Sequence, residues 1–192
     1  KLAGLEDVIV PVCYELRADG TIRLTATYPG AQGLPTMPCF GVEWALPSSI
    51  DHLRFYGLGP VEAYADRLDG ANLGVWEANA VQGLAPYAVP QETGYHPGAR
   101  WCEVRDAEGH GLRIEARGEL GVSLLPYSSA QIEQAGHWWE MPAPERRAAT
   151  YLRLLTAQMG VGGDDSWGSP VHDEFHVDAS GTQVLDVTLS LI

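Results

Sequence analysis

The chain has 192 residues, of which 45% are apolar and 19% charged, and its formal net charge is −13. That composition is ordinary for a globular protein, and the length is ample for one hydrophobic core. The acidic balance argues against nucleic acids and anionic membranes as partners, because both require clustered positive charge. It is compatible with a neutral ligand such as a sugar.

The ends and the cysteines bear on the cellular compartment. No stretch approaches the roughly 18–20 apolar residues that span a bilayer, and residues 1–10 lack the apolar run and cleavage site of a signal peptide. The three cysteines, Cys13, Cys39 and Cys102, are odd in number and far apart, so we expect neither a disulfide framework nor a zinc site. Free cysteines of this kind suggest that the protein resides in a reducing cytoplasm. The chain opens without Met near a strand-like run, which suggests a fragment of a longer polypeptide.

The repeating pattern is that of an all-β protein, with short alternating strands separated by Gly, Pro and Asp. Residues 7–16 form the first predicted strand. The Asp19-Gly20 turn leads into a second over residues 22–28, because Asp-Gly tolerates the positive φ of tight hairpins. Even-numbered residues of this strand are apolar and odd-numbered ones polar, so one face is buried. Further strands are predicted over residues 40–46, 53–57, 73–78, 100–105, 112–117, 151–157, 175–178 and 185–191.

Helix is scarce in the sequence. Only residues 128–135 predict one, with Ser128 or Ser129 as N-cap and Gly136 as the stop signal. A turn at residues 107–109 joins two of the strands in a second hairpin. Many strands with little helix give a sandwich or a barrel, and this length favours a sandwich. We therefore expect one antiparallel β-sandwich domain over residues 1–192.

Two segments in the first half are richer in polar groups than a generic sandwich requires. Residues 55–60 read Phe-Tyr-Gly-Leu-Gly-Pro, which marks a strand ending in a tight loop, and Asp66-Arg67 follows. This acid–base pair is expected to form charge-assisted bonds with each other or with neighbours. Residues 87–94 read Tyr-Ala-Val-Pro-Gln-Glu-Thr-Gly, and Arg100-Trp101 comes soon after.

Two more segments lie in the second half. Pro126-Tyr127-Ser128 leads into the predicted helix, which His137-Trp138-Trp139 follows. Residues 159–167 read Met-Gly-Val-Gly-Gly-Asp-Asp-Ser-Trp, and the glycines give this loop unusual backbone freedom. The loop presents two acids, a hydroxyl and an indole. An indole offers a flat apolar face to a pyranose, and carboxylates accept hydrogen bonds from sugar hydroxyls.

In this order, the four segments resemble the last domain of the large bacterial β-galactosidases of glycoside hydrolase family 2, from about residue 6 to the end. The resemblance implies a large antiparallel β-sandwich of the galactose-mutarotase type, with more strands before this chain begins. It implies a parent enzyme that hydrolyses terminal β-galactosyl residues, as in lactose. The catalytic glutamates would lie on a TIM-barrel domain outside this chain, and magnesium and sodium ions mainly outside it. The parent would be a cytoplasmic homo-oligomer.

The resemblance also assigns roles within the chain. The glycine-rich loop would reach the mouth of the active site, and Trp167 would line the pocket for the leaving sugar. Asp164, Asp165 and Ser166 are weaker binding candidates, since loop capping explains the two acids as well. One residue departs from the family: Leu155 stands where an Asp is usual.

Several polar residues are better explained by structure than by chemistry. We expect a buried polar network that fixes loops, because buried charges need partners; its members are Glu62, Asp66, Arg67, Glu92 and Arg100. His172 and His176 flank two acids, but a surface strand accommodates them without a metal. A retaining glycosidase needs two carboxyls about 5–5.5 Å apart, and adjacent Asp164 and Asp165 on extended backbone diverge.

Three other roles remain open at this stage. An independent carbohydrate-binding module would bind galactose or lactose by itself. A structural assembly domain would bury exposed aromatic residues such as Trp138 and Trp139 only in the parent. A mutarotase-like enzyme would need an acid and a base facing one sugar, for which His137 or His176 with Glu92 are the candidates.

Overall fold

The computed structural model describes residues 8–85 and 87–192. Its strands are β1 (Val12–Leu16), β2 (Ile22–Tyr28), β3 (Cys39–Pro47), β4 (His52–Gly59), β5 (Asn72–Asn79), β6 (His96–Arg105), β7 (Gly111–Leu125), β8 (Ala149–Gln158) and β9 (Gln183–Leu191). The helix α1 (Ser129–Gln134) and the 3-10 helices η1 (Trp138–Glu140), η2 (Pro144–Arg146) and η3 (Asp173–Phe175) complete it. Every strand pairing is antiparallel, which confirms the predicted all-β class. No helix in this described part is long and apolar enough to cross a membrane.

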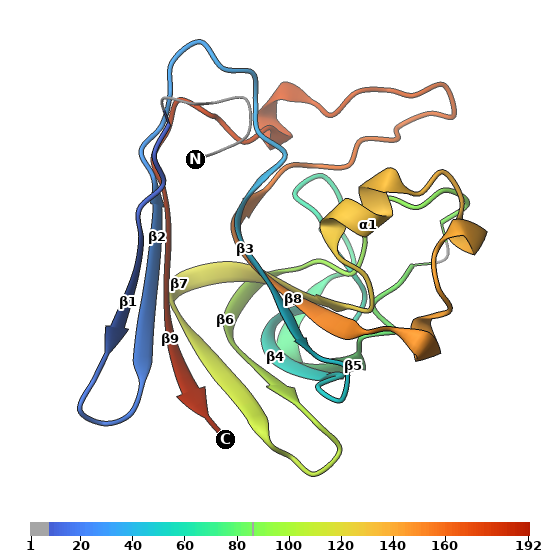
Figure 1. The fold of residues 1–192 in the computed structure, drawn as a ribbon. Helices are drawn as coiled ribbons and strands as arrows, with labels where there is room; N and C mark the ends of the chain where they lie inside the picture. The colour runs from blue at the N-terminus through green and yellow to red at the C-terminus, as the bar shows by residue number, and fades with distance from the viewer. Residues whose placement is uncertain (1–7, 86) are drawn as a thin grey trace.

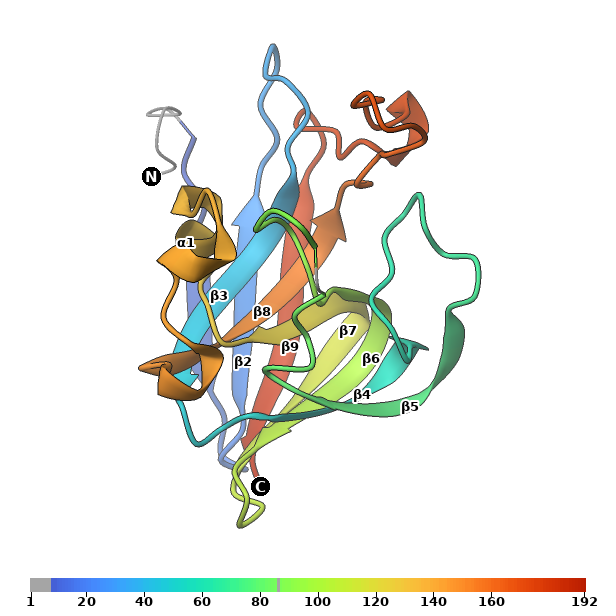
Figure 2. The same ribbon diagram turned by 90° about the vertical axis from the view of Figure 1, so that its right-hand side faces the viewer.

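The sheet forks at β7. One edge of β7 pairs with β6, while its other edge pairs with β9 over residues 112–116 and with β8 over residues 121–125. The order β1-β2-β9 therefore continues from the first half of β7, and β8-β3 from its second half. Figure 2 shows β3 and β8 crossing in front of β2 and β9. The result is two layers that share one strand.

One hydrophobic core fills the space between these layers. Leu24 on β2 and Val187 on β9 are fully buried from one side, and Leu154 on β8 from the other. The rings of Tyr28 and Phe40 meet across the gap with centroids 5.8 Å apart. The Tyr28 hydroxyl also donates to the Ala179 carbonyl at 2.6 Å, so its polar end is satisfied inside the core.

The predicted second strand has the bounds of β2, and its alternation is that of the burial pattern. The first strand is shorter than predicted: β1 starts at Val12, because Pro11 has no amide hydrogen to donate to a ladder. The predicted start at residue 7 lies outside the described residues. The predicted helix is confirmed, and Ser128 forms a capping box with Gln131.

Two predictions need correction. The predicted strand over residues 112–117 runs on to Leu125, and residues 120–125 are all buried because this stretch is covered on both faces and so lacks alternation. The predicted strand over residues 175–178 is wrong: Asp173–Phe175 is a 3-10 helix, and only Val177 makes a bridge, to Met37. Asp178 ends the segment by accepting a hydrogen bond from the Ser180 amide.

Within residues 8–85 and 87–192, no element covers one edge of the sandwich. Val12, Tyr14 and Leu16 pair with the inward-facing side of β2, yet all three are exposed. β1 lies at the outer edge of its layer (Figure 1), and β3 ends the other layer. Core-facing side chains are thus left open to whatever lies beyond β1.

We expect Leu154→Ala to lower the free energy of unfolding by about 2–5 kcal/mol, because it opens a cavity between the layers. Urea denaturation of the chain is the measurement. Leu191→Ala is the control, since Leu191 is 84% exposed on β9 and should change stability by less than about 0.5 kcal/mol. Equal losses for the two variants would contradict this assignment of the core.

Candidate functional site

The glycine-rich loop, defined here as residues 159–172, connects β8 to η3 and presents Trp167. At its base the Met159 amide donates to the Pro38 carbonyl at 2.8 Å, and the Gly160 amide donates to the Phe175 carbonyl at 3.0 Å. Trp167 is 91% exposed. A side chain with so large an apolar face, held away from the core, is available to a ligand or a partner.

The two acids of the loop are engaged within it. The Asp165 carboxylate accepts hydrogen bonds from the Trp167 amide at 2.8 Å and the Ser169 amide at 3.2 Å, and these bonds lower the pKa of Asp165. Asp164 pairs with His172 at 2.5 Å, which raises the pKa of the imidazole. Ser166 is exposed. Asp165 thus has the capping role that competes with sugar binding, whereas the bond of Asp164 is to a side chain.

Glu62 is the centre of a second set of contacts. It accepts hydrogen bonds from the Gly94 amide at 2.6 Å, from Thr93 Oγ1 at 3.1 Å, from Arg67 at 3.1 Å and from the Tyr87 hydroxyl. Burial, and then the bond to Glu62, raise the pKa of Tyr87. The glutamate therefore ties the loop after β4 to the segment before β6.

The five residues expected in one network fall into separate groups. Arg67 joins Glu62 rather than Asp66, whose carboxylate contacts the glycine-rich loop instead. Glu92 forms a two-pronged pair with Arg153 of β8, with bonds of 2.9 and 3.0 Å. Arg100 pairs with Glu119 at 2.6 Å and donates to the Gly98 carbonyl.

Sequence reasoning missed Arg153, although a buried arginine in the apolar run Tyr-Leu-Arg-Leu-Leu is a detectable signal of a partner. Two residues further along β8, Leu155 is buried in a small cluster with Tyr64 and Tyr95. Burial raises the pKa of Tyr95 to about 12. An apolar residue at position 155 thus packs against two tyrosine rings.

The aromatic residues after α1 divide between packing and exposure. Trp138 Nε1 donates to the Tyr87 carbonyl at 2.6 Å. Trp139 is 78% exposed and stacks on His137, with ring centroids 4.0 Å apart. His137 itself pairs with Glu140 at 2.9 Å, so a structural partner accounts for it.

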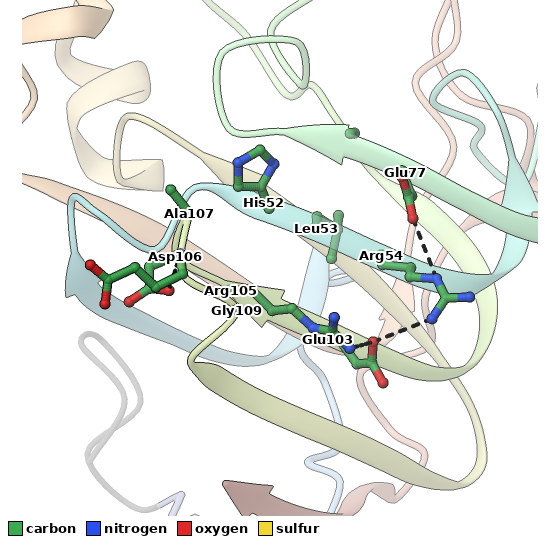
Figure 3. A pocket seen from close by; sticks show the side chains of 11 residues that line it. His52, Leu53, Arg54, Glu77, Glu103, Arg105, Asp106, Ala107 and Gly109 are labelled. Atoms are coloured by element: carbon green, nitrogen blue, oxygen red, sulfur yellow. Dashed lines mark hydrogen bonds and ion pairs between the residues drawn. The ribbon is translucent and has the colours of Figure 1, made fainter. Parts of the chain in front are cut away.

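A polar cavity of about 340 Å³ lies beside β4 and β6 (Figure 3). Several of its charged groups pair with one another or with Arg113. Glu103, whose side chain is 6% exposed, pairs with Arg113 at 2.7 Å, Arg54 at 3.7 Å and Arg105. Arg54 also pairs with Glu77 at 3.4 Å. A carboxylate enclosed by three guanidinium groups is an ion-pair centre of the sheet, and it does not resemble the acid pair of a glycosidase.

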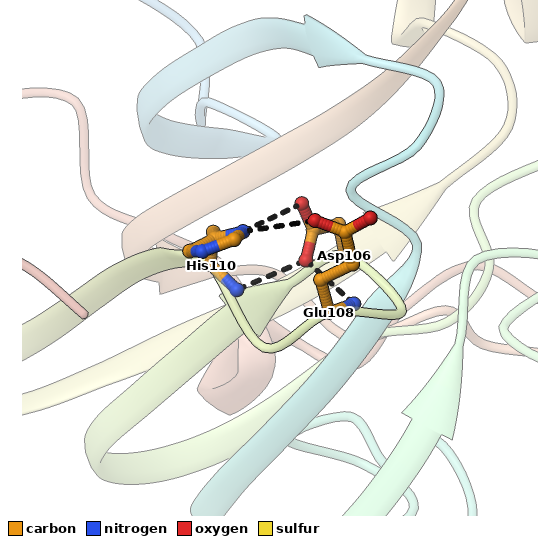
Figure 4. Close-up of side chains that lie close together, drawn as sticks. All are labelled: Asp106, Glu108 and His110. Atoms are coloured by element: carbon orange, nitrogen blue, oxygen red, sulfur yellow. Dashed lines mark hydrogen bonds and ion pairs between the residues drawn. The ribbon is translucent and has the colours of Figure 1, made fainter.

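A possible ligand set for a cation forms in the β6–β7 turn, where oxygen and nitrogen atoms of Asp106, Glu108 and His110 lie within 4.8 Å of one another (Figure 4). The turn itself uses the aspartate: one Asp106 oxygen accepts from the amides of Glu108 and His110, both at 2.9 Å. Magnesium prefers an octahedral oxygen set, which this exposed group does not supply. We assign no ion to it.

Sequence comparison finds relatives that are named β-galactosidases. A family described as "Beta galactosidase small chain" matches residues 3–189. The "Beta-galactosidase BgaC" of Bifidobacterium adolescentis is 50% identical over 188 residues, which cover 95% of this chain and 17% of that protein. The "Beta-galactosidase" of Streptococcus thermophilus is 46% identical over 176 residues, 91% of this chain and 17% of that protein.

A shorter relative is the "Beta-galactosidase small subunit" of Latilactobacillus sakei, 34% identical over 192 residues, which cover 94% of this chain and 59% of that protein. The chain thus spans about one sixth of the length of the first two relatives. Among solved structures, a galactose mutarotase-like protein from Lactobacillus casei aligns with a TM-score of 0.41 and 11% identity over 100% of this chain and 67% of that one.

We expect Asp164→Asn to lower the pKa of His172 toward that of a free imidazole, because Asp164 is the main cause of its rise. Since the pKa is raised in the folded state, the pair stabilises the loop below the ordinary histidine pKa, and the contribution is lost as the pH rises through the raised value. An NMR titration of the imidazole measures it. Asp165→Asn is the control, because an asparagine keeps the cap; an unshifted His172 in Asp164→Asn would refute the pairing.

Proposed function

The chain belongs to the β-galactosidase small-chain family, and from this premise we propose that it is the C-terminal segment of a β-galactosidase of glycoside hydrolase family 2. The parent hydrolyses terminal β-D-galactosyl residues, with lactose as its substrate. The segment is not catalytic itself. It walls the active site and contributes Trp167 to the subsite of the leaving sugar.

One observation carries the proposal: an indole that is 91% exposed stands on a loop anchored at its base. Exposure leaves one flat face free to stack on the apolar face of a pyranose. The anchoring matters because a freely moving loop would lose conformational entropy on binding, which weakens affinity. Asp164 and Asp165, engaged inside the loop, support its shape and are secondary contacts to the sugar.

The acids of this chain support a non-catalytic role. A retaining glycosidase needs one free carboxylate as nucleophile and a second as acid and base, about 5–5.5 Å apart. Asp165 caps backbone amides, Asp164 pairs with His172, and Glu103 is enclosed by arginines. As the resemblance to family 2 implies, the proposal assigns the nucleophile and the acid/base to glutamates of a TIM-barrel domain elsewhere in the parent.

The uncovered side of β1 supports packing against other domains of the parent. Val12, Tyr14 and Leu16 face the core side of the sheet, and the described part of the chain places no layer over them. Apolar surface of this kind is normally buried against protein. We further propose a cytoplasmic homo-oligomer as the parent, with magnesium and sodium held mainly by residues outside this chain.

An independent sugar-binding module is the second candidate, favoured by the Trp139 ring stacked on His137. Titration calorimetry of the isolated chain with lactose separates the two functions. A pocket wall that is completed by the parent predicts no measurable heat at millimolar lactose. Saturable binding that Trp139→Ala abolishes would favour the module.

We expect Trp167→Ala in the parent enzyme to raise the KM for lactose roughly tenfold, equivalent to about 1.4 kcal/mol, because a stacking face is lost. The kcat should change less, since the reacting groups are untouched. Steady-state kinetics with lactose, and the yield of galactosyl transfer to added glucose, measure both effects.

Trp139→Ala is the matched control, because it removes an indole of similar exposure from a different part of the chain. It should leave KM and transfer unchanged. A Trp167→Ala enzyme with unaltered KM and unaltered transfer would refute the proposed role of the loop.

A further inference from the structure

Two of the unusual sequence segments meet in the fold. Asp66, in the loop after β4, accepts a hydrogen bond from the Gly162 amide at 2.7 Å through its Oδ2 atom, across 96 residues of sequence. A carboxylate bonded to a backbone amide is a charge-assisted contact. The acid of the first segment thus contacts the glycine-rich loop of the last one.

Gly160 packs closely against the same Asp66 carboxylate. A Cβ atom at this position would lie 2.4 Å from Asp66 Oδ2 and 2.6 Å from its Cγ, much closer than carbon atoms approach in proteins. Gly160 is itself buried. The aspartate therefore occupies the space that any larger residue at position 160 would need, and the two positions are coupled sterically.

The main body of the sandwich, and not the loop, fixes Asp66. Tyr64 is fully buried and stacks on Tyr95 with ring centroids 5.6 Å apart. The Arg67 amide donates to the Tyr64 carbonyl at 2.8 Å, and its guanidinium pairs with Glu62 and lies over the Tyr64 ring. Contacts with the sandwich thus hold Tyr64 and Arg67, on either side of Asp66, without help from the glycine-rich loop.

The other side-chain contacts of the loop are internal. Asp165 bonds to Trp167 and Ser169, and Asp164 bonds to His172. These contacts give the loop its shape but do not attach it to the sandwich. Over residues 8–85 and 87–192, Asp66 is the one side chain from outside the loop that hydrogen-bonds to it.

We propose that Asp66 is a positioning residue that clamps the glycine-rich loop at Gly162 and so sets where Trp167 meets the leaving sugar. The inference rests on the proposed function of Trp167. Trp167 lies five residues after the clamp, and Gly162 and Gly163, which lack side chains, would otherwise leave this stretch many conformations. Asp66 acts through the loop and does not touch the substrate.

The test uses the parent enzyme with Asp66→Ala. We expect the KM for lactose to rise roughly three- to tenfold, no more than in Trp167→Ala, with kcat within about twofold of the unmodified enzyme. Amide hydrogen exchange across residues 159–167, followed by mass spectrometry, should become faster because the bond to the Gly162 amide is lost. Asp66→Asn keeps an acceptor and should restore part of both properties.

Asp69→Ala is the matched control, because it removes an exposed aspartate from the same loop. It should change neither KM nor exchange. Gly160→Ala tests the same contact from the loop. The added methyl group must displace the Asp66 carboxylate, so this variant should have the same KM and exchange as Asp66→Ala. In the Asp66→Ala background the obstacle is gone, and Gly160→Ala should add little.

A double-mutant cycle distinguishes positioning from general damage to the fold. If Asp66 acts only through Trp167, then Asp66→Ala should not raise KM further in a Trp167→Ala enzyme. Additive losses would overturn the positioning role, as would unchanged KM and exchange in Asp66→Ala while Trp167→Ala raises KM. Those results would leave the proposed function intact. An unaltered KM in Trp167→Ala would overturn the proposed function and the positioning role together.

Discussion

The architecture depends on the backbone hydrogen bonds of β7, the strand that both layers share. A strand has only two edges, and β7 gives one of them to β6 while dividing the other between β9 and β8. The division falls around Gly118, whose φ of +113° lies outside the range that other residues readily adopt. Because β8 and β9 leave the same edge in different directions, their layers face each other and enclose the core.

The fork also determines where the loops meet. Arg153 and Leu155 lie in the part of β8 that pairs with β3 and β7. Arg153 holds Glu92, and Leu155 packs with Tyr64 and Tyr95, so the segments after β4 and before β6 are fixed against β8. The glycine-rich loop leaves the end of this same strand. Asp66, from the segment after β4, is therefore close enough to the loop to accept the hydrogen bond of the Gly162 amide.

Local sequence patterns predicted the local structure. They failed where contacts between distant parts of the chain determine the structure. The alternation over residues 22–28 and the Ser128 cap are signals contained in a few residues, and the structure confirms both. The second half of β7 has no alternation, because the fork covers both of its faces. Likewise, charge alone suggested that Asp66 and Arg67 belong to one network. Their separate partners could be found only from the fold. Asp66 bonds to Gly162, 96 residues away, and Arg67 bonds to Glu62, five residues away.

The glycines of the loop show why a motif encodes shape as well as freedom of motion. Gly162 and Gly163 have φ angles of +64° and +90°, a region that side chains disfavour, so they turn the chain. Gly160 has no such angle, and its missing side chain instead makes room for the Asp66 carboxylate. Gly162 and Gly163 let the chain turn, and Gly160 lets an acid from the sandwich hold the loop. The two requirements together allow a surface loop to carry a large exposed indole in one place, and they explain why glycine is needed at each position for a different reason.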